Sequence, residues 1–221
     1  MILLASKSSG RLATLRAAGV EPLVRVSTVD EEAVLGELIQ RRRDAGLTAP
    51  SAAEQVQALA RAKALDVMAS TDPQEAEVVV GCDSMLEISG QVVGKPTDAA
   101  DARERWRLMS GGTGTLHTGH FLVRTADGAI AEGVSSATIR FGSPTQTEIE
   151  AYIASGEPLW CAGAFTIDGL GGAFIEGIDG DPHGVVGISL PLLRRLLADL
   201  EVLWTDLWAP PPVSKPTGDA H

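Results

Sequence analysis

The stretch that decides the fold is ILLASKSSGRLATLRAAG, residues 2–19. Its apolar beginning, residues 2–5, predicts a buried strand, and the polar run after it predicts a turn. Residues 11–18 have helical spacing and are followed by Gly19, a residue that favours helix ends. A turn between a strand and a helix gathers backbone N–H groups and hydroxyls at the helix N-terminus, where anions bind.

Strands and helices alternate in the first half of the chain, and hairpins dominate later. Capping boxes at Ser51 and Thr145 predict helix starts. Residues 36–50 are charged and predict an irregular segment, in which Arg41–Arg43 is better explained as a solvated helix face than as a phosphate patch. The other predicted helices cover residues 97–109 and 191–203. The other predicted strands cover residues 22–26, 78–83, 86–88, 91–93, 115–124, 129–141, 159–167 and 173–178. This pattern predicts an α/β or α+β fold with a large mixed sheet, and we expect two lobes.

Composition excludes several classes of function. The 221 residues include 18 Lys and Arg against 29 Asp and Glu, a formal charge of −11. Such a chain is a poor binder of nucleic acid polymers or anionic membranes, so any polyanion needs a local cation cluster or a metal ion. No apolar run reaches the roughly 18 residues of a membrane span, and no signal peptide is expected. Cys82 and Cys161 predict reduced thiols in a cytoplasmic protein. We expect one domain over residues 1–208 and a flexible Pro-rich tail over residues 209–221.

Seven polar residues stand at predicted turns, on a helix face or at a strand end. Their chemistry suggests binding of a phosphate ester together with a metal ion. Three cations and two hydroxyls suit a phosphate chain, and two carboxylates suit Mg²⁺. The cations and hydroxyls are Ser6, Ser8, Arg11, Lys63 and Lys95, and the carboxylates are Glu31 and Asp83. Asp83 ends a predicted buried strand, where α/β sheets place ligand chemistry. Lys63 lies on or beside an apolar helix face, so it either meets an anion there or extends its ammonium to water.

Motifs in order along the chain resemble those of the Maf family of nucleotide pyrophosphatases. The opening Leu4–Arg11 is similar to the family's L-A-S-x-S-P-R-R. The further matches are Val29–Glu31, Leu59–Ala64, Gly81–Asp83, Gly94–Pro96, Ser110-Gly111 with His117, Ala162–Phe165 and Gly184–Ile188. The resemblance spans about residues 2–200, nearly the whole chain.

The resemblance implies a two-lobed α/β fold like that of inosine triphosphate pyrophosphatases, with a curved mixed sheet and a central cleft. It implies metal-dependent cleavage of a nucleoside triphosphate to the monophosphate and diphosphate, with Mg²⁺ or Mn²⁺ as cofactor. Asp83 would be the catalytic carboxylate and share the metal with Glu31. The substrate would be held by Ser6, Ser8, Arg11, Lys63 and Lys95. The family is usually cytoplasmic and often dimeric, so a homodimer is one expectation, and it was first linked to inhibition of septum formation.

Departures from the family pattern leave two questions open: which base the substrate carries, and how efficiently the protein cleaves it. Ser9 and Gly10 replace the family's Pro and first Arg, so a phosphate contact is weaker or comes from elsewhere. Cys161 and Asp168 stand where the branch acting on dTTP and UTP has lysine and glutamine. Residues 160–163 and 180–182 look more like the branch acting on 7-methyl-GTP. Trp160 stacks on a base or, as is more frequent, lies in the core. The alternatives are a 7-methyl-GTP or modified-nucleotide pyrophosphatase, a weakly catalytic regulator of septum formation, and a phosphohydrolase that releases orthophosphate.

Overall fold

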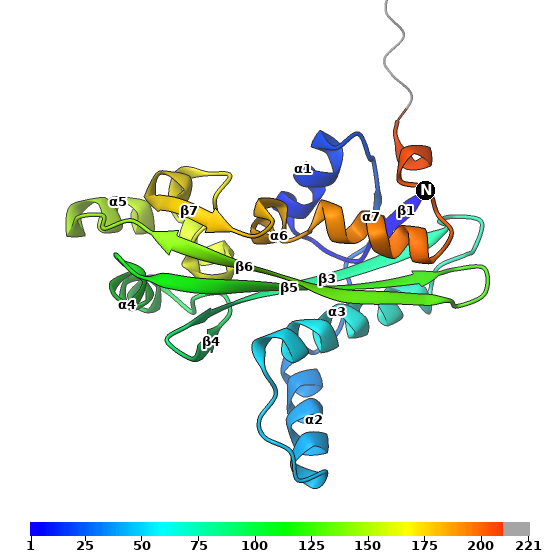
Figure 1. Cartoon of the computed structure of the whole chain (residues 1–221), viewed down its shortest axis with the longest axis horizontal. Coiled ribbons are helices and arrows are strands. Elements are labelled where there is room, and N and C mark those ends of the chain that lie inside the picture. The colour runs from blue at the N-terminus through cyan, green and yellow to red at the C-terminus, as the bar shows by residue number, and fades with distance from the viewer. Residues whose placement is uncertain (210–221) are drawn as a thin grey trace, which may run out of the picture.

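The computed structural model describes residues 1–209, and these form one mixed sheet flanked by helices (Figure 1). The predicted tail, apart from Ala209, lies outside the described residues. The strands are β1 (Ile2–Leu4), β2 (Leu23–Val24), β3 (Val78–Ile88), β4 (Gln91–Val93), β5 (Thr113–Arg124), β6 (Ile130–Phe141) and β7 (Ile175–Asp179). The α-helices are α1 (Ser9–Ala17), α2 (Glu31–Asp44), α3 (Ala52–Met68), α4 (Ala99–Met109), α5 (Gln146–Ala154), α6 (Pro182–Val186) and α7 (Leu190–Asp199).

The strand order is β2-β1-β3-β5-β6-β7, with β4 paired to β3. β1 is parallel to both β2 and β3, whereas β5 is antiparallel to both of its neighbours, β3 and β6, so the predicted mixed sheet is confirmed. The hairpin turns predicted at Ser89-Gly90 and Asp127-Gly128 join β3 to β4 and β5 to β6. β1 and the hairpin strands β3, β5 and β6 pair in one sheet, so the hairpin-rich part and the N-terminal part are not on separate segments.

The two faces of the sheet carry different helices. α3 lies on one face, and α1, α6 and α7 lie on the other (Figure 1). On the α7 face, β3 contributes Val80 and Cys82 to one apolar core and Leu86 and Ile88 to another. Ser84, between them on the same face, belongs to neither core. The expected two lobes are therefore two cores on one continuous sheet, separated at the polar residue Ser84.

The structure corrects the prediction for residues 36–50, because α2 continues to Asp44. Its N-cap, Asp30, accepts a hydrogen bond from the Ala33 amide, and acidic residues in its first turn and arginines in its last turn match the helix dipole. It has no fully buried residue, which is why no clear apolar stripe marked it. Arg41 and Arg43 are exposed, as expected of a solvated helix face.

The prediction of a strand over residues 159–167 is also wrong. Short 3₁₀ turns occupy Glu157–Trp160 and Ala162–Ala164. Pro158 begins the first turn, and Gly163 has φ of 73°, which breaks any extended run of backbone. A Cβ at Gly163 would lie 2.6 Å from the Leu86 side chain, so only glycine lets this loop pack on β3. The apolar run is a partly buried loop, and its composition resembles that of a buried strand.

Candidate active site

The pairing of β3 leaves one stretch of its edge open. β1 pairs with Val78–Val80, and β4 pairs with Leu86–Ile88 on the same side, so residues 81–85 have no strand partner there among the described residues. β1, β2 and β4 all end beside this open stretch because of their directions relative to β3. The segments that follow them carry Ser6–Arg11, Glu31 and Lys95. The topology therefore brings residues far apart in the sequence to one place.

Two carboxylates and one lysine form the centre of this place. Lys63 Nζ lies 2.6 Å from Asp83 Oδ1 and 2.7 Å from Glu31 Oε1. Lys63 comes from α3, Asp83 from β3 and Glu31 from the first residue of α2. The side chains of Lys63 and Asp83 are 12% and 11% exposed. Of the two readings of Lys63 from its spacing, contact with an anion is the correct one.

Asp83 is not at the end of its strand, as the sequence predicted, because β3 continues for five further residues to Ile88. Asp83 instead lies at the open part of the β3 edge and faces α3. The end of the apolar run was mistaken for the end of the strand, whereas the strand continues with Ser84 on the opposite face and apolar residues beyond it. What exposes the site is the missing neighbour strand rather than the strand terminus.

The two carboxylates have opposite pKa shifts. Burial raises the pKa of Asp83, against the opposing charges of Lys63 and Arg11. Burial also raises the pKa of Glu31, but Lys63, Lys95 and Arg11 outweigh it and lower this pKa overall. Glu31 is therefore firmly ionised at neutral pH. Asp83 holds a proton more strongly than an ordinary aspartate, which suits a group that accepts a proton from water.

Lys95 belongs to the same cluster, although its side chain is exposed. Its charge contributes to lowering the pKa of Glu31 and also acts on Cys161. The backbone before it is fixed, because the Gly94 carbonyl accepts hydrogen bonds from the Gly163 amide and from Arg105. Lys95 thus extends from an anchored turn as an exposed cation.

Arg11 lies deeper, on the other side of β3. Its Nε donates to the Gly187 carbonyl at 2.7 Å, its Nη1 to Ser6 Oγ at 2.9 Å and its Nη2 to Ser84 Oγ at 3.0 Å. Its residue is only 9% exposed. Asp83 and Ser84 are adjacent on β3 and point to opposite faces, so the strand separates the Arg11 guanidinium from the carboxylate cluster by its own thickness.

The two predicted hydroxyls already have partners within the chain. Ser6 Oγ accepts from Arg11 and, at 3.2 Å, from the Ser8 amide. Ser8 is the N-cap of α1, and its Oγ accepts from the Arg11 amide at 3.3 Å. Both hydroxyls shape the turn and hold Arg11, and their hydrogen bonds to a substrate stay a prediction.

Residues at the departures from the family pattern border this site. A Cβ at Gly10 would lie 3.8 Å from Asp168 Oδ2, which places Asp168 beside the start of α1. Asp168 and Lys95 both influence the pKa of Cys161, so these side chains lie near one another. Trp160 is 79% exposed, so the expectation of a core tryptophan is wrong. An exposed indole has a free ring face, so the alternative of stacking on a base stays a prediction.

Sequence reasoning missed Ser84, Thr118 and the Gly187 carbonyl. Ser84 Oγ lies 2.9 Å from Thr118 Oγ1, and Thr118 donates to the Gly184 carbonyl at 2.8 Å. A signal was present, since alternation along β5 puts Thr118 and His120 on an otherwise apolar buried face. A polar side chain there needs a partner.

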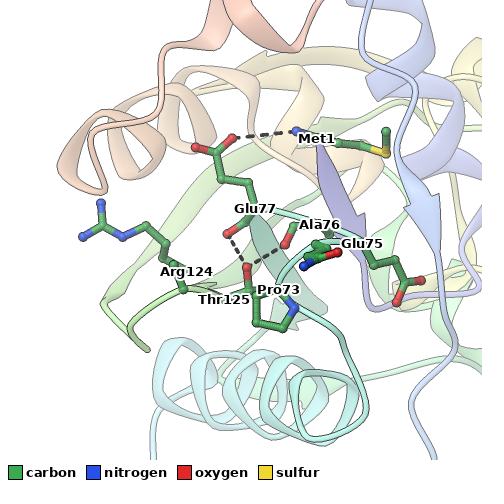
Figure 2. Close-up of a pocket in the computed structure, with 9 residues that line it drawn as sticks. Met1, Pro73, Glu75, Ala76, Glu77, Arg124 and Thr125 are labelled. Carbon is green, nitrogen blue, oxygen red and sulfur yellow. Dashed lines mark hydrogen bonds and ion pairs between the residues drawn. The ribbon is translucent and has the colours of Figure 1, made fainter.

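A separate hollow lies at the other end of β1. Met1, Glu75, Ala76, Glu77 and Thr125 line it, and Figure 2 shows Thr125 donating to the backbone carbonyls of Ala76 and Glu77. β1 runs away from this hollow toward the open edge of β3, so the two places are distinct. None of the seven predicted site residues lines this hollow. The hydrogen bonds from Thr125 join the end of β5 to the segment before β3.

The carboxylates fit a magnesium-type ion as a partial ligand set. In residues 1–209 no group of three or more His, Cys, Asp or Glu side chains could together hold a metal. Glu31 and Asp83 touch the same lysine nitrogen, so their oxygens lie close together. Mg²⁺ is commonly bound by one or two carboxylates, with substrate phosphates and water completing the shell. The donor set present matches that mode.

A mixed α/β sheet with buried cations and paired carboxylates at an open strand edge defines a protein that binds phosphorylated ligands. Comparison with known proteins agrees. The family model "Maf-like protein" matches residues 1–200. A nucleoside triphosphate pyrophosphatase of Streptomyces coelicolor is 52% identical over 209 residues, which cover 95% of each chain. Proteins of the same name from Saccharopolyspora erythraea and Rhodococcus jostii are each 51% identical, over 94% and 93% of this chain and 97% and 95% of theirs. The chain belongs to the Maf family.

Lys95→Ala tests whether this exposed cation holds a phosphate. We expect KM for the triphosphate to rise about tenfold and kcat to fall by a smaller factor, because a charge-assisted hydrogen bond is lost at an exposed position. Steady-state kinetics measure both. Arg107 pairs with Glu104 on the surface of α4, so Arg107→Ala is the control that removes a cation elsewhere. Unchanged KM in Lys95→Ala would remove Lys95 from the site.

Proposed function

We propose that the protein hydrolyses a nucleoside 5′-triphosphate to the monophosphate and diphosphate. The observation that carries the proposal is the Lys63–Asp83–Glu31 cluster, which shares one open strand edge with Arg11 and Lys95. Relatives about half identical over almost their whole length, and named nucleoside triphosphate pyrophosphatase, support the same activity.

Glu31 and Asp83 would hold a divalent cation, Mg²⁺ or Mn²⁺. The bound ion would neutralise phosphate charge and allow an acidic protein to accept an acidic substrate. The paired carboxylates support this assignment, since both contact the same Lys63 nitrogen and a metal ion can be bound by two such oxygens.

The chain's own residues divide the remaining work. Asp83 orients a water molecule and accepts its proton, because it is the carboxylate whose pKa burial raises above the ordinary value. Arg11 and Lys95 approach from opposite sides of the open edge, where they bind phosphate oxygens and stabilise the departing diphosphate. Lys63 keeps the two carboxylates together and adds a third positive charge. Ser6 and Ser8 hold the turn that carries Arg11.

The base that the enzyme prefers is a finer question than the cleavage itself. Asp168 lies beside the start of α1, its charge and that of Lys95 act on Cys161, and Trp160 next to Cys161 is exposed. We propose that they contact the base and favour 7-methyl-GTP or another modified nucleotide over dTTP and UTP. Gly10 supplies no side chain for a phosphate, which is the single feature that favours slow turnover and a regulatory role in septum formation.

A panel of triphosphates with standard and modified bases tests the function. We expect diphosphate release with Mg²⁺ or Mn²⁺, and loss of the activity in EDTA that returns when metal is added. Chromatography identifies the products. Orthophosphate as the first product would show a different phosphohydrolase, and binding of nucleotides without any diphosphate release would show the regulator.

The proposal extends to the cellular location and the oligomeric state of the protein. Among the described helices, none has the length and apolar character to cross a membrane. Two free cysteines and the net charge of −11 support a cytoplasmic protein that does not bind nucleic acid polymers. A homodimer is proposed from the family alone, and sedimentation measures it.

A further inference from the structure

Arg11 is a buried cation held only by neutral groups. Its three side-chain contacts are the Gly187 carbonyl and the hydroxyls of Ser6 and Ser84. No carboxylate of residues 1–209 forms an ion pair with its guanidinium. Asp83 is adjacent to Ser84 on β3, so its carboxylate lies across the strand from the guanidinium. A guanidinium released from its contacts would be attracted to that carboxylate and would no longer be available to bind a phosphate.

The hydrogen bonds behind Ser84 have a fixed direction. A guanidinium only donates, and a carbonyl only accepts. Thr118 has one hydroxyl proton, and it is donated to the Gly184 carbonyl, 2.8 Å away. The bond of 2.9 Å between Ser84 and Thr118 must therefore be donated by Ser84. Ser84 Oγ is then left with its lone pairs toward Arg11 Nη2, so Thr118 makes Ser84 an acceptor for Arg11.

A second contact from β5 holds the loop that supplies the Gly187 carbonyl. His120 Nε2 accepts from the Ser189 amide at 2.9 Å, so its Nδ1 carries the proton that is donated to the Thr118 carbonyl at 3.1 Å. Burial lowers the pKa of His120 to about 4, so the ring stays neutral at physiological pH. Gly187 has φ of +125°, which only glycine adopts readily, and this turns its carbonyl toward Arg11 Nε.

We propose that Thr118, which is fully buried and does not reach the open edge, is a positioning residue that acts through Ser84 and Gly184 to keep the Arg11 guanidinium aimed at the substrate phosphates and away from Asp83. The polar residues Ser84 and Thr118, which lie between the two cores of the α7 face, are thereby explained as the support of Arg11. This inference rests on the proposed function for the identity of the anion.

Thr118→Val tests the proposal, because it keeps the shape of the side chain and removes the hydroxyl. The probe is inorganic tripolyphosphate, whose binding to the full chain in EDTA is measured by calorimetry. We expect its Kd to rise about tenfold in Thr118→Val and by less than about threefold in Thr118→Ser, which restores the hydroxyl. With substrate and Mg²⁺, we expect KM to rise by more than kcat falls.

Thr125→Val is the matched control. Thr125 is a buried threonine that follows β5, and its hydroxyl donates to the Ala76 carbonyl at 2.6 Å (Figure 2). It lies beyond the Val78 end of β3, whereas Arg11 contacts Ser84 farther along that strand. It should lose comparable thermal stability and bind tripolyphosphate like the unchanged protein. Ser84→Ala is the second variant, should Thr118→Val fail to fold, and it should also weaken binding about tenfold.

Three results would overturn the proposal: normal binding in folded Thr118→Val, equal weakening in Thr125→Val, or no binding of tripolyphosphate by the unchanged protein. If the unchanged protein binds tripolyphosphate, Thr118→Val weakens this binding and no nucleotide is hydrolysed, the positioning role is supported and the proposed reaction fails.

Discussion

Asp83→Asn should lower kcat about 10³-fold, the range expected when a group that accepts a proton from the attacking water is removed. The amide keeps the size of the side chain and can still receive a hydrogen bond from Lys63. Metal affinity should also fall, so kcat is measured at saturating Mn²⁺ as well as Mg²⁺. Activity within about tenfold of the unchanged enzyme would remove Asp83 from the catalytic role.

Stability and binding should change in the opposite direction to activity. Burial raises the pKa of Asp83, so its ionised form costs folding free energy above that pKa, and this cost is relieved as the pH falls. A neutral Asn avoids the cost, so the melting temperature at pH 7.5 should be equal or higher. Tripolyphosphate in EDTA should bind more tightly, because one negative charge is gone. Asp127→Asn, in the β5–β6 turn, is the control and should leave kcat within about twofold.

Lys63→Met should lower kcat/KM by about 10² and destabilise the protein, because it leaves the buried Asp83 carboxylate beside Glu31 without their shared cation. Removing one partner of a buried ion pair costs about 3 kcal/mol. Urea unfolding at several pH values measures this loss.

The pH dependence of that loss has a definite sign. Lys63 opposes the effect of burial on the pKa of Asp83, so its removal raises this pKa further. The folded state then binds a proton that the unfolded state releases, and stability is regained as the pH falls from 8 toward 5. Arg61→Met is the control on the same helix, since Arg61 contacts the Phe121 ring and not the carboxylates. A loss that grows toward low pH would contradict the ion-pair account.

The sequence predicted the sheet and its hairpins because strong local signals mark them. Long apolar strands, tight turns at Ser89-Gly90 and Asp127-Gly128, and capping boxes at Ser51 and Thr145 all agree with the structure. α2 was missed because its capping and charge pattern, rather than an apolar stripe, favour helix. Residues 159–167 were misread because burial without periodicity does not distinguish a strand from a packed loop.

The candidate site was predicted in its charged residues and missed in its support. A folded protein must neutralise a charge near its core or use it in function. Each charged residue could therefore be singled out separately from the sequence, namely Arg11, Lys63, Asp83 and Glu31. That Lys63 joins both carboxylates depends on the placement of α2 and α3, which no local pattern encodes. Thr118 and Gly187 act through a hydroxyl direction and a carbonyl orientation, and these exist only once the strands are paired.

The central claim is that the open edge of β3 binds the polyphosphate and its metal in one place. A crystal structure with Mn²⁺ and a nucleoside triphosphate analogue that carries a methylene bridge between the α- and β-phosphates tests it directly. The account predicts an anomalous Mn²⁺ signal in contact with Glu31 and Asp83, and phosphate oxygens in contact with Arg11 and Lys95. An analogue bound elsewhere, for example in the hollow beside Thr125, with the Lys63 ion pairs unchanged, would contradict it.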